Sequence, residues 1–315
     1  MKKYQLYGIL TKKAVTKITM KNEISRRQFI QRTLGAGIAL TALSPYLAAM
    51  DKKGPKGLQL GLVTYQWAKD WDLPTVISNC EKSGVLGVEL RTQHAHKAEI
   101  NLNAAQRAEV KKRFADSPVT CVGYGSNYEF HSPDPAKLRE NIDGAKEYVK
   151  LCKDIGATGL KVKPNTLPKE VEREKTIAQI ARSLNELGKF AKDYGQLIRV
   201  ECHGSITQEI PNMKAIFEQV TEKNVKMCWN SNDVDLNPPG LEANFNSVKQ
   251  WIGDTTHIRG IKISEYPYEQ LFRLLSGIKY NGWILVEATT PYTDPVAVLK
   301  EQLMLFNEIM GRIRG

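Results

Sequence analysis

The stretch TGLKVKPNTLPKEVEREKTIAQIARSLNELGKFAKDYGQLIRVECHG, residues 158–204, decides the fold. Its two ends, 158–164 and 197–204, are short runs rich in apolar and β-branched residues, which is typical of buried strands. The segment between them, 168–195, starts with proline and ends at glycine, as helices often do. Strand, helix and strand in this order predict one unit of a parallel sheet.

Units of the same kind recur along the chain. The strand candidates are 58–65, 85–91, 118–125, 158–164, 197–204, 225–230, 257–264 and 283–288. The helical segments include 72–84, 103–117, 134–156, 168–195 and 294–313. Eight units in about 250 residues predict a single (β/α)8 TIM barrel over residues 50–315. A doubly wound sheet is the alternative, but VTYQWAKDW, residues 63–71, stands where its GxGxxG motif would follow the first strand.

The N-terminal residues 1–49 are predicted to be a twin-arginine export signal that is removed from the mature protein. SRRQFI, residues 25–30, is followed by an apolar segment, 33–49, shorter than the roughly 20 residues that span a bilayer. Met20 is a candidate for the true start. The alternatives are an uncleaved N-terminal anchor or an amphipathic N-terminus. We therefore expect a periplasmic or otherwise exported protein with no stable membrane span.

The signal region also explains the charge. The chain has a formal charge of +11, but residues 1–50 hold nine Lys or Arg against one acid, which leaves +3 for the remainder. So small an excess argues against a nucleic-acid partner and favours a small molecule. An oligomer is left open.

The five cysteines are odd in number and form no CxxC motif. Each lies in an apolar segment, which predicts buried single thiols rather than disulfides or a zinc ribbon.

Polar side chains gather at the predicted carboxyl ends of the strands, where TIM barrels carry their active sites. They are, in chain order, Tyr65, Trp67, Glu89, Arg91, His94, His96, Glu129, His131, Lys161, Lys163, Glu201, His203, Asn230, Asn232, Lys262, Glu265 and Glu287. Four of the five histidines belong to this set. The fifth, His257, starts the seventh predicted strand and is interpreted as structural.

Glu201 and Glu287 form the central pair of candidates. Carboxylates from separate strands can bind a divalent ion or move a proton beside a carbonyl. A salt bridge at the barrel rim is the alternative for either residue, and Glu89 with Arg91 could simply pair with each other. Tyr65 and Trp67 could stack on a sugar or cover the barrel mouth.

The segments GVELRTQHAH, EFHSPDP, IGATGLKVKPN, VECHG, CWNSN, EYPYEQLFRLL and VEA resemble the xylose-isomerase-like sugar phosphate isomerase/epimerase barrels, especially the exported twin-arginine subgroup. The resemblance covers residues 58–312. It implies one divalent ion, often manganese, held by a Glu, an Asp, a His and a Glu after strands five to eight. By position these fall on Glu201, Asn230, Lys262 and Glu287, with Glu265 used to set the register.

Two of these four positions depart from the family pattern. An asparagine oxygen can ligate a hard cation but adds no charge, whereas a protonated lysine repels it. Lys262, assisted by Lys163, could instead supply the positive charge that stabilises an enolate oxygen. Alternatively, a metal could be bound by Glu201, His203 and Glu287 with Asn230, or with histidines of the strand-two loop.

The leading function hypothesis is a sugar isomerase or epimerase that removes a proton next to a carbonyl of a free or oxidised sugar through an enediolate. The predicted catalytic residues are Glu201, Glu287, Lys262 and Lys163. The predicted substrate-binding residues are Trp67, Arg91, His94, His96, Glu129, His131, Asn230 and Asn232. A lyase or hydratase on 3-keto-glycosides is the second hypothesis, a non-catalytic sugar-binding protein the third, and a nuclease of the endonuclease IV type the last.

Overall fold

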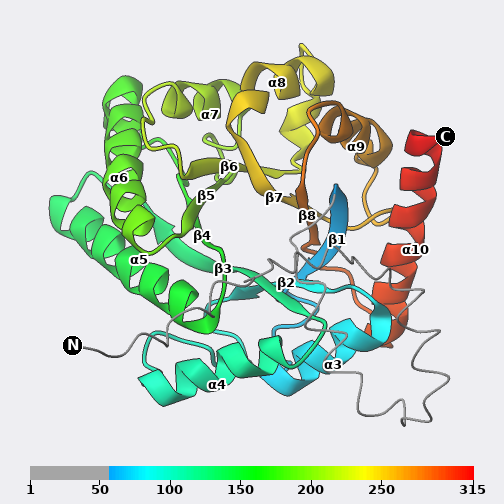
Figure 1. Cartoon of the computed structure of the whole chain (residues 1–315). Helices are drawn as coiled ribbons and strands as arrows, with labels where there is room; N and C mark the ends of the chain where they lie inside the picture. Colours follow the sequence, from blue (N-terminus) through cyan, green and yellow to red (C-terminus); the bar gives the residue numbers. More distant parts are fainter. Residues whose placement is uncertain (1–56) are drawn as a thin grey trace, which may run out of the picture. The chain divides into compact units, whose positions relative to one another are not determined.

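The computed structural model describes residues 57–315, which form a closed eight-stranded parallel barrel surrounded by helices (Figure 1). The strands are β1 Leu58–Val63, β2 Gly87–Arg91, β3 Thr120–Glu129, β4 Gly159–Lys163, β5 Leu197–Glu201, β6 Val225–Asn230, β7 Ile252–Ile258 and β8 Gly282–Val286. The α-helices are α3 Leu73–Ser83, α4 Ala104–Ala115, α5 Pro135–Ile155, α6 Arg173–Asp193, α7 Ile210–Phe217, α8 Leu241–Val248, α9 Tyr268–Gly277 and α10 Pro295–Arg314. Two 3₁₀ helices, η2 Asp233–Leu236 and η3 Lys249–Trp251, flank α8. The predicted (β/α)8 TIM barrel is confirmed.

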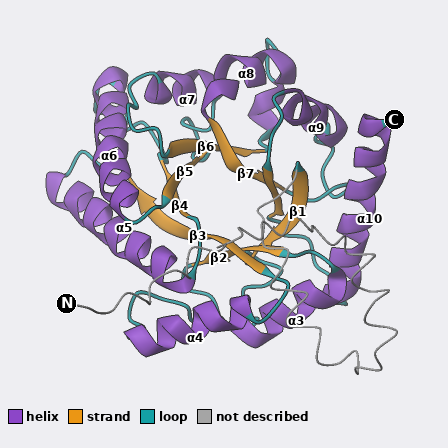
Figure 2. Ribbon diagram, in the orientation of Figure 1, coloured by secondary structure: helices purple, strands orange, loops and turns teal. Residues whose placement is uncertain are grey.

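Strands neighbouring in sequence lie side by side around the barrel (Figure 2), and β1 pairs with β8 to close it. All eight ladders are parallel, so the carboxyl ends of the strands meet at one mouth. The predicted signal, residues 1–49, lies outside the described residues.

The seventh strand differs from its prediction. It was predicted over 257–264 but lies at Ile252–Ile258, because the β-branched pair Thr255 and Thr256 sits inside it and Gly260, with φ +107°, turns the chain soon after it ends. His257 is therefore the second-last residue of β7 instead of its first. This shift of the strand alters the membership of the functional site.

The helix ends follow the punctuation seen in the sequence. The side chain of Asp72 accepts a hydrogen bond from the Thr75 N–H and caps α3, and Gly84 ends that helix with φ +82°. Asp134 caps α5 in the same way ahead of its proline, and Asp294 caps α10. These local signals set where each outer helix begins and ends.

A buried arginine fills the end of the barrel away from the mouth. Arg199 of β5 forms a bidentate pair with Asp254 through Nε (2.9 Å) and Nη2 (2.8 Å), and donates to the Val122 carbonyl at 3.0 Å. A Cβ at Gly123 would lie 2.3 Å from Arg199 Nη1, so glycine is needed there. This end of the barrel is closed by structural contacts, and the open end is left for chemistry.

The five cysteines are all buried and free of disulfides, which confirms the prediction of single thiols. Within residues 57–315, no helix is long and apolar enough to cross a membrane.

Candidate active site

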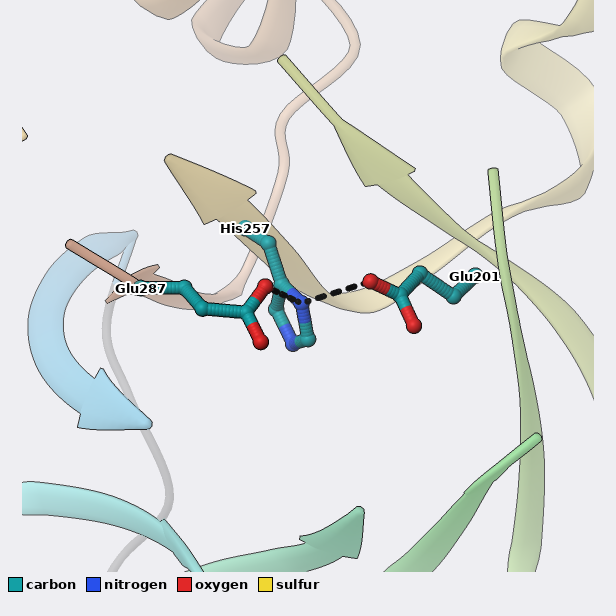
Figure 3. Close-up of side chains that lie close together, drawn as sticks. All are labelled: Glu201, His257 and Glu287. Atoms are coloured by element: carbon teal, nitrogen blue, oxygen red, sulfur yellow. Dashed lines mark ion pairs between the residues drawn. The ribbon is translucent and has the colours of Figure 1, made fainter. Parts of the chain in front are cut away.

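Three ionisable side chains converge at the barrel mouth from strands that are distant in sequence. Glu201 ends β5, His257 is near the end of β7, and Glu287 directly follows β8. His257 Nδ1 lies 3.6 Å from Glu201 Oε1 and 3.3 Å from Glu287 Oε2, so the ring stands between the two carboxylates (Figure 3). The Glu287 N–H donates to the carbonyl of Ile258 at 2.7 Å, which sets its height in the barrel beside His257.

Glu201 is held by a buried cation and an amide. Its Oε2 accepts a hydrogen bond from Lys161 Nζ of β4 at 2.5 Å, and its Oε1 accepts from Asn230 Nδ2 of β6 at 3.2 Å. The Lys161 and Glu201 side chains are 1% and 2% exposed. Burial alone would raise the pKa of Glu201, but the charges of Lys161 and His257 outweigh it and hold that pKa well below its usual range. Glu201 is therefore a fixed carboxylate.

His257 is fully buried and faces a third carboxylate on its other side. Its Nε2 lies 3.4 Å from Glu89 Oε1 of β2. Burial lowers the pKa of His257, but Cys228 and the carboxylates of Glu89 and Glu201 raise it to a net value well above the ordinary one. In the described part of the chain, neither ring nitrogen of His257 nor either oxygen of Glu89 makes a hydrogen bond.

The unpartnered Nδ1 of His257, which lies between two carboxylates, fits a metal site. Glu201, His257 and Glu287 each offer one ligand atom, and all three atoms lie within 4.8 Å of one another. Imidazole nitrogen with two carboxylate oxygens is a donor set used by zinc and manganese. An ion at Nδ1 would leave Nε2–H free to donate to Glu89, the usual arrangement in which a carboxylate orients a ligating histidine.

This arrangement predicts that Glu89→Leu weakens metal binding about 10- to 100-fold, the usual cost of removing such an orienting group. Glu89→Gln, which keeps an oxygen to accept from Nε2–H, is expected to lose less. The measurement is a competition titration of Mn²⁺ or Zn²⁺ against a chromophoric chelator at fixed pH. Equal metal affinity in Glu89→Leu and wild type would contradict the orienting role.

A pocket of about 420 Å³ opens above the Glu–His–Glu group. Its lining is polar and mixed in charge: Tyr65, Arg91, Lys163, Glu201, His203, Gly204, Ser205, Gln208, Asn230, Asn232, Arg259, Glu287 and Thr289. Seven residues singled out in the sequence as catalytic, substrate-binding or metal-binding are brought together here: Arg91, Lys163, Glu201, His203, Asn230, Asn232 and Glu287. The mixture of amides, carboxylates and cations suits a small hydroxylated ligand.

The sequence profile of the xylose isomerase-like TIM barrel family matches residues 77–234, half of the chain. The chain belongs to this family. The matched segment contains Glu201 and Asn230, whereas His257 and Glu287 lie beyond it.

Several solved TIM-barrel structures superpose on most of the chain. An L-ribulose 3-epimerase has a TM-score of 0.69 at 15% identity, covering 82% of this chain and 96% of its own. The 3-keto-D-glucoside 4-epimerase YcjR of E. coli has a TM-score of 0.64 at 12% identity, covering 82% and 99%. An IOLI protein with a bound zinc atom has a TM-score of 0.63 at 17% identity, covering 81% and 97%. At these identities the likeness establishes the shared fold.

The prediction that Lys262 occupies the strand-seven ligand position is wrong. Because β7 ends at Ile258, Lys262 falls in the following turn, where it is exposed with φ +61° and lines a different groove together with Glu265. His257, interpreted from the sequence as structural, is the strand-seven residue that faces both glutamates. The strand-like run Thr255 to Ile258 was the signal that could have found it.

His203 is not part of the Glu–His–Glu group, contrary to the alternative that made it a metal ligand. It lines the pocket, and its Nδ1 lies 3.2 Å from Asn165 Oδ1. An amide oxygen can only accept a hydrogen bond, so Nδ1 carries the proton. Nε2 is then left as the acceptor. Burial, with Lys163 and Lys161 adding to it, lowers the pKa of His203 in spite of Glu201. Gly204 permits this packing, since a Cβ there would lie 1.4 Å from the Asn165 carbonyl oxygen.

Five predicted substrate-binding residues do not line the pocket: Trp67, His94, His96, Glu129 and His131. Trp67 is buried and its indole N–H donates to the Thr290 carbonyl at 2.7 Å, so it joins the loops after β1 and β8. His96 is also buried. Its Nδ1 accepts from the Ala98 N–H and its Nε2 donates to the Arg91 carbonyl, and burial lowers its pKa to about 4, so it is a neutral structural residue.

The loop after β6 is anchored by a buried aspartate, Asp235, which is not among the site residues predicted from the sequence. Asp235 Oδ2 accepts from the Asn232 N–H at 3.0 Å and from the Tyr266 hydroxyl at 2.9 Å. Its Oδ1 makes no hydrogen bond within the described residues. Burial raises the pKa of Asp235 from 3.8 to about 7, even though Tyr266 and Asn232 act against it.

The pKa of Asp235 is higher in the folded state than in the unfolded state, so the native state binds more protons between about pH 4 and 7. The stability of the protein therefore falls as pH rises through that window. At about 1.4 kcal/mol per pKa unit, the loss is on the order of 4 kcal/mol. Asp235→Asn is therefore expected to match the wild-type melting temperature near pH 4 and to exceed it at pH 8. A difference in melting temperature between Asp235→Asn and wild type that is the same near pH 4 and at pH 8 would contradict this. The exposed neighbour Asp233→Asn serves as control.

Proposed function

We propose that this family member is a sugar isomerase or epimerase, which removes a proton next to a carbonyl of a free or oxidised sugar and passes through an enediolate. One observation carries the proposal: carboxylates at the ends of β5 and β8 face His257 and line a polar, sugar-sized pocket. The names of two of the superposed structures, a ribulose and a 3-keto-glucoside epimerase, support the same class.

Glu287 is the better placed proton acceptor. Its side chain is 13% exposed and lines the pocket, whereas that of Glu201 is 2% exposed and bonded to Lys161. A carboxylate with a strongly lowered pKa is a weak base, which makes Glu201 the poorer acceptor. Glu201 then serves to orient the site. It is also the second acid/base candidate, because its Oε1 is not the oxygen that is bonded to Lys161.

Glu201, His257 and Glu287 would hold a divalent metal ion, with manganese as the ion implied by the family resemblance. When bound there, such an ion supplies a Lewis acid for the carbonyl oxygen of the sugar. Asn230 and Asn232 line the pocket, where their amides can bind sugar hydroxyls.

A lyase or hydratase acting on 3-keto-glycosides is the second candidate. It is favoured by His203, a further proton-transfer group that lines the same pocket and is oriented by Asn165. Elimination needs such a group for the departing oxygen in addition to the base that removes the proton.

The test is incubation of the purified protein with ketoses and 3-keto-glycosides in D₂O, with added Mn²⁺ and with chelator, followed by NMR. Deuterium incorporation beside the carbonyl with the carbon skeleton retained supports the isomerase, and loss of the aglycone supports the lyase. A site that uses the metal loses exchange on chelation and regains it when Mn²⁺ returns. Absence of exchange and of product across the panel would leave a sugar-binding protein.

Export through the predicted twin-arginine signal is also part of the proposal. A location outside the cytoplasm fits a free sugar better than a phosphorylated one. Cell fractionation of an Arg26→Lys, Arg27→Lys variant tests it, since the precursor should remain in the cytoplasm.

A further inference from the structure

The pocket has two chemically different walls. Glu201, Asn230 and Glu287 stand at the ends of β5, β6 and β8, on the same side as Arg259, which pairs with Asp233, and the opposite wall is built from β1 to β4. Two cations dominate that second wall: Arg91 at the end of β2 and Lys163 at the end of β4. Neither is the proton acceptor in the proposed reaction.

The two cations converge on one neutral oxygen. Arg91 Nη2 donates to Asn127 Oδ1 at 3.0 Å, and Lys163 Nζ donates to the same atom at 3.3 Å. Asn127 belongs to β3, between the strands that carry the cations. Two positive charges are thus held side by side with only an amide oxygen between them.

Within the described residues, nearby carboxylates compensate this pair only in part. Lys163 makes no ion pair there, and Arg91 forms one with Glu287, whose Oε1 lies 3.7 Å from Nη1 without a hydrogen bond. The Arg91 guanidinium is held in place from another side by the ring of Tyr65, whose centroid lies 4.8 Å away. Burial and the charge of Lys161 lower the pKa of Lys163, although Glu201 and Glu129 act in the opposite sense. An anion arriving at this wall would relieve the repulsion between the two cations.

We propose that the substrate of this site is a sugar acid whose carboxylate binds between Arg91 and Lys163, with its carbonyl end at Glu287. The inference rests on the proposed function for the reacting end of the pocket. A carboxylate is opposite in charge to the pair and of suitable size, because a guanidinium and an ammonium can together bind its two oxygens. A phosphate has a third terminal oxygen, for which this pair leaves no separate cation.

The test uses three ligands that differ only at carbon 6: D-fructose, D-fructuronate and D-fructose 6-phosphate. Titration calorimetry on the metal-loaded protein is expected to show fructuronate binding at least about tenfold more tightly than fructose, with only the fructuronate affinity falling as salt is raised. Lys163→Met should remove about tenfold or more of the fructuronate affinity and leave fructose within about threefold. Lys262→Met, an exposed lysine outside this pocket, is the matched control and should change neither.

Equal binding of fructose and fructuronate, tighter binding of the phosphate, or equal weakening of all three ligands by Lys163→Met would each overturn the proposal. If Lys163 instead stabilised the enediolate, Lys163→Met would lower kcat on fructose as much as on fructuronate. The experiment distinguishes failure of the isomerase proposal from failure of the proposed carboxylate subsite. A Lys163-dependent preference for fructuronate without deuterium exchange would sink only the isomerase, and exchange on fructose without that preference would sink only the subsite.

Discussion

Glu287→Gln is expected to lower the rate of deuterium exchange beside the substrate carbonyl by about 10³-fold, within the range for loss of a general base. The amide keeps the size of the side chain but cannot take up a proton. Because Glu287 also faces His257 Nδ1 at 3.3 Å, exchange should be measured at saturating Mn²⁺ with bound metal quantified. Metal occupancy can then be separated from proton transfer.

The matched control is Glu265→Gln, an exposed carboxylate in the groove that contains Lys262. It should exchange at the wild-type rate. If metal-loaded Glu287→Gln kept more than about a tenth of the wild-type rate, Glu287 would not be the base.

Lys161→Met is expected to destabilise the protein by about 3–5 kcal/mol, because it leaves the Glu201 carboxylate buried without its partner. Both side chains are almost fully excluded from solvent, so water cannot replace the lost ammonium. Urea unfolding of the chelated protein measures the effect. The double variant Lys161→Met, Glu201→Leu should recover most of the loss, because no unpaired charge then remains.

An exposed ion pair provides the comparison. Lys214 and Glu218 lie 3.8 Å apart with half-exposed side chains, and Lys214→Met should change stability by less than about 0.5 kcal/mol. A Lys161→Met variant no less stable than Lys214→Met would show that the buried pair adds nothing to the fold.

The seventh strand shows where reading the sequence failed. Its predicted start at His257 made that histidine structural and moved the ligand position to Lys262. The misplacement arose because IRGIKIS, residues 258–264, also alternates apolar and polar residues, and alternation alone does not distinguish a strand from the turn after it. The left-handed Gly260 ends the strand, and His257 is thereby placed beside Glu201 and Glu287.

Trp67 and Lys161 show a second kind of limit. Trp67 follows the first strand and looks like a sugar platform, but its indole is bonded to Thr290, which is more than 200 residues away in sequence. Lys161 was placed at the end of the fourth strand, but its role could not be predicted, because its partner Glu201 lies on the next strand, 40 residues further along the chain. Partners at such separations are decided by packing and leave no local trace.

The sequence by itself determined the barrel, the order of its units and the polar residue types at its strand ends. Those features depend on alternation, helix caps and turns, which are set by residues close together in the chain. Only the tertiary structure decided that His257 joins Glu201 and Glu287, that Lys161 neutralises Glu201, and that Arg91 and Lys163 face them from the other wall. Those choices depend on the register between strands and on closure of the barrel by β1 and β8, which bring together side chains from opposite ends of the sequence.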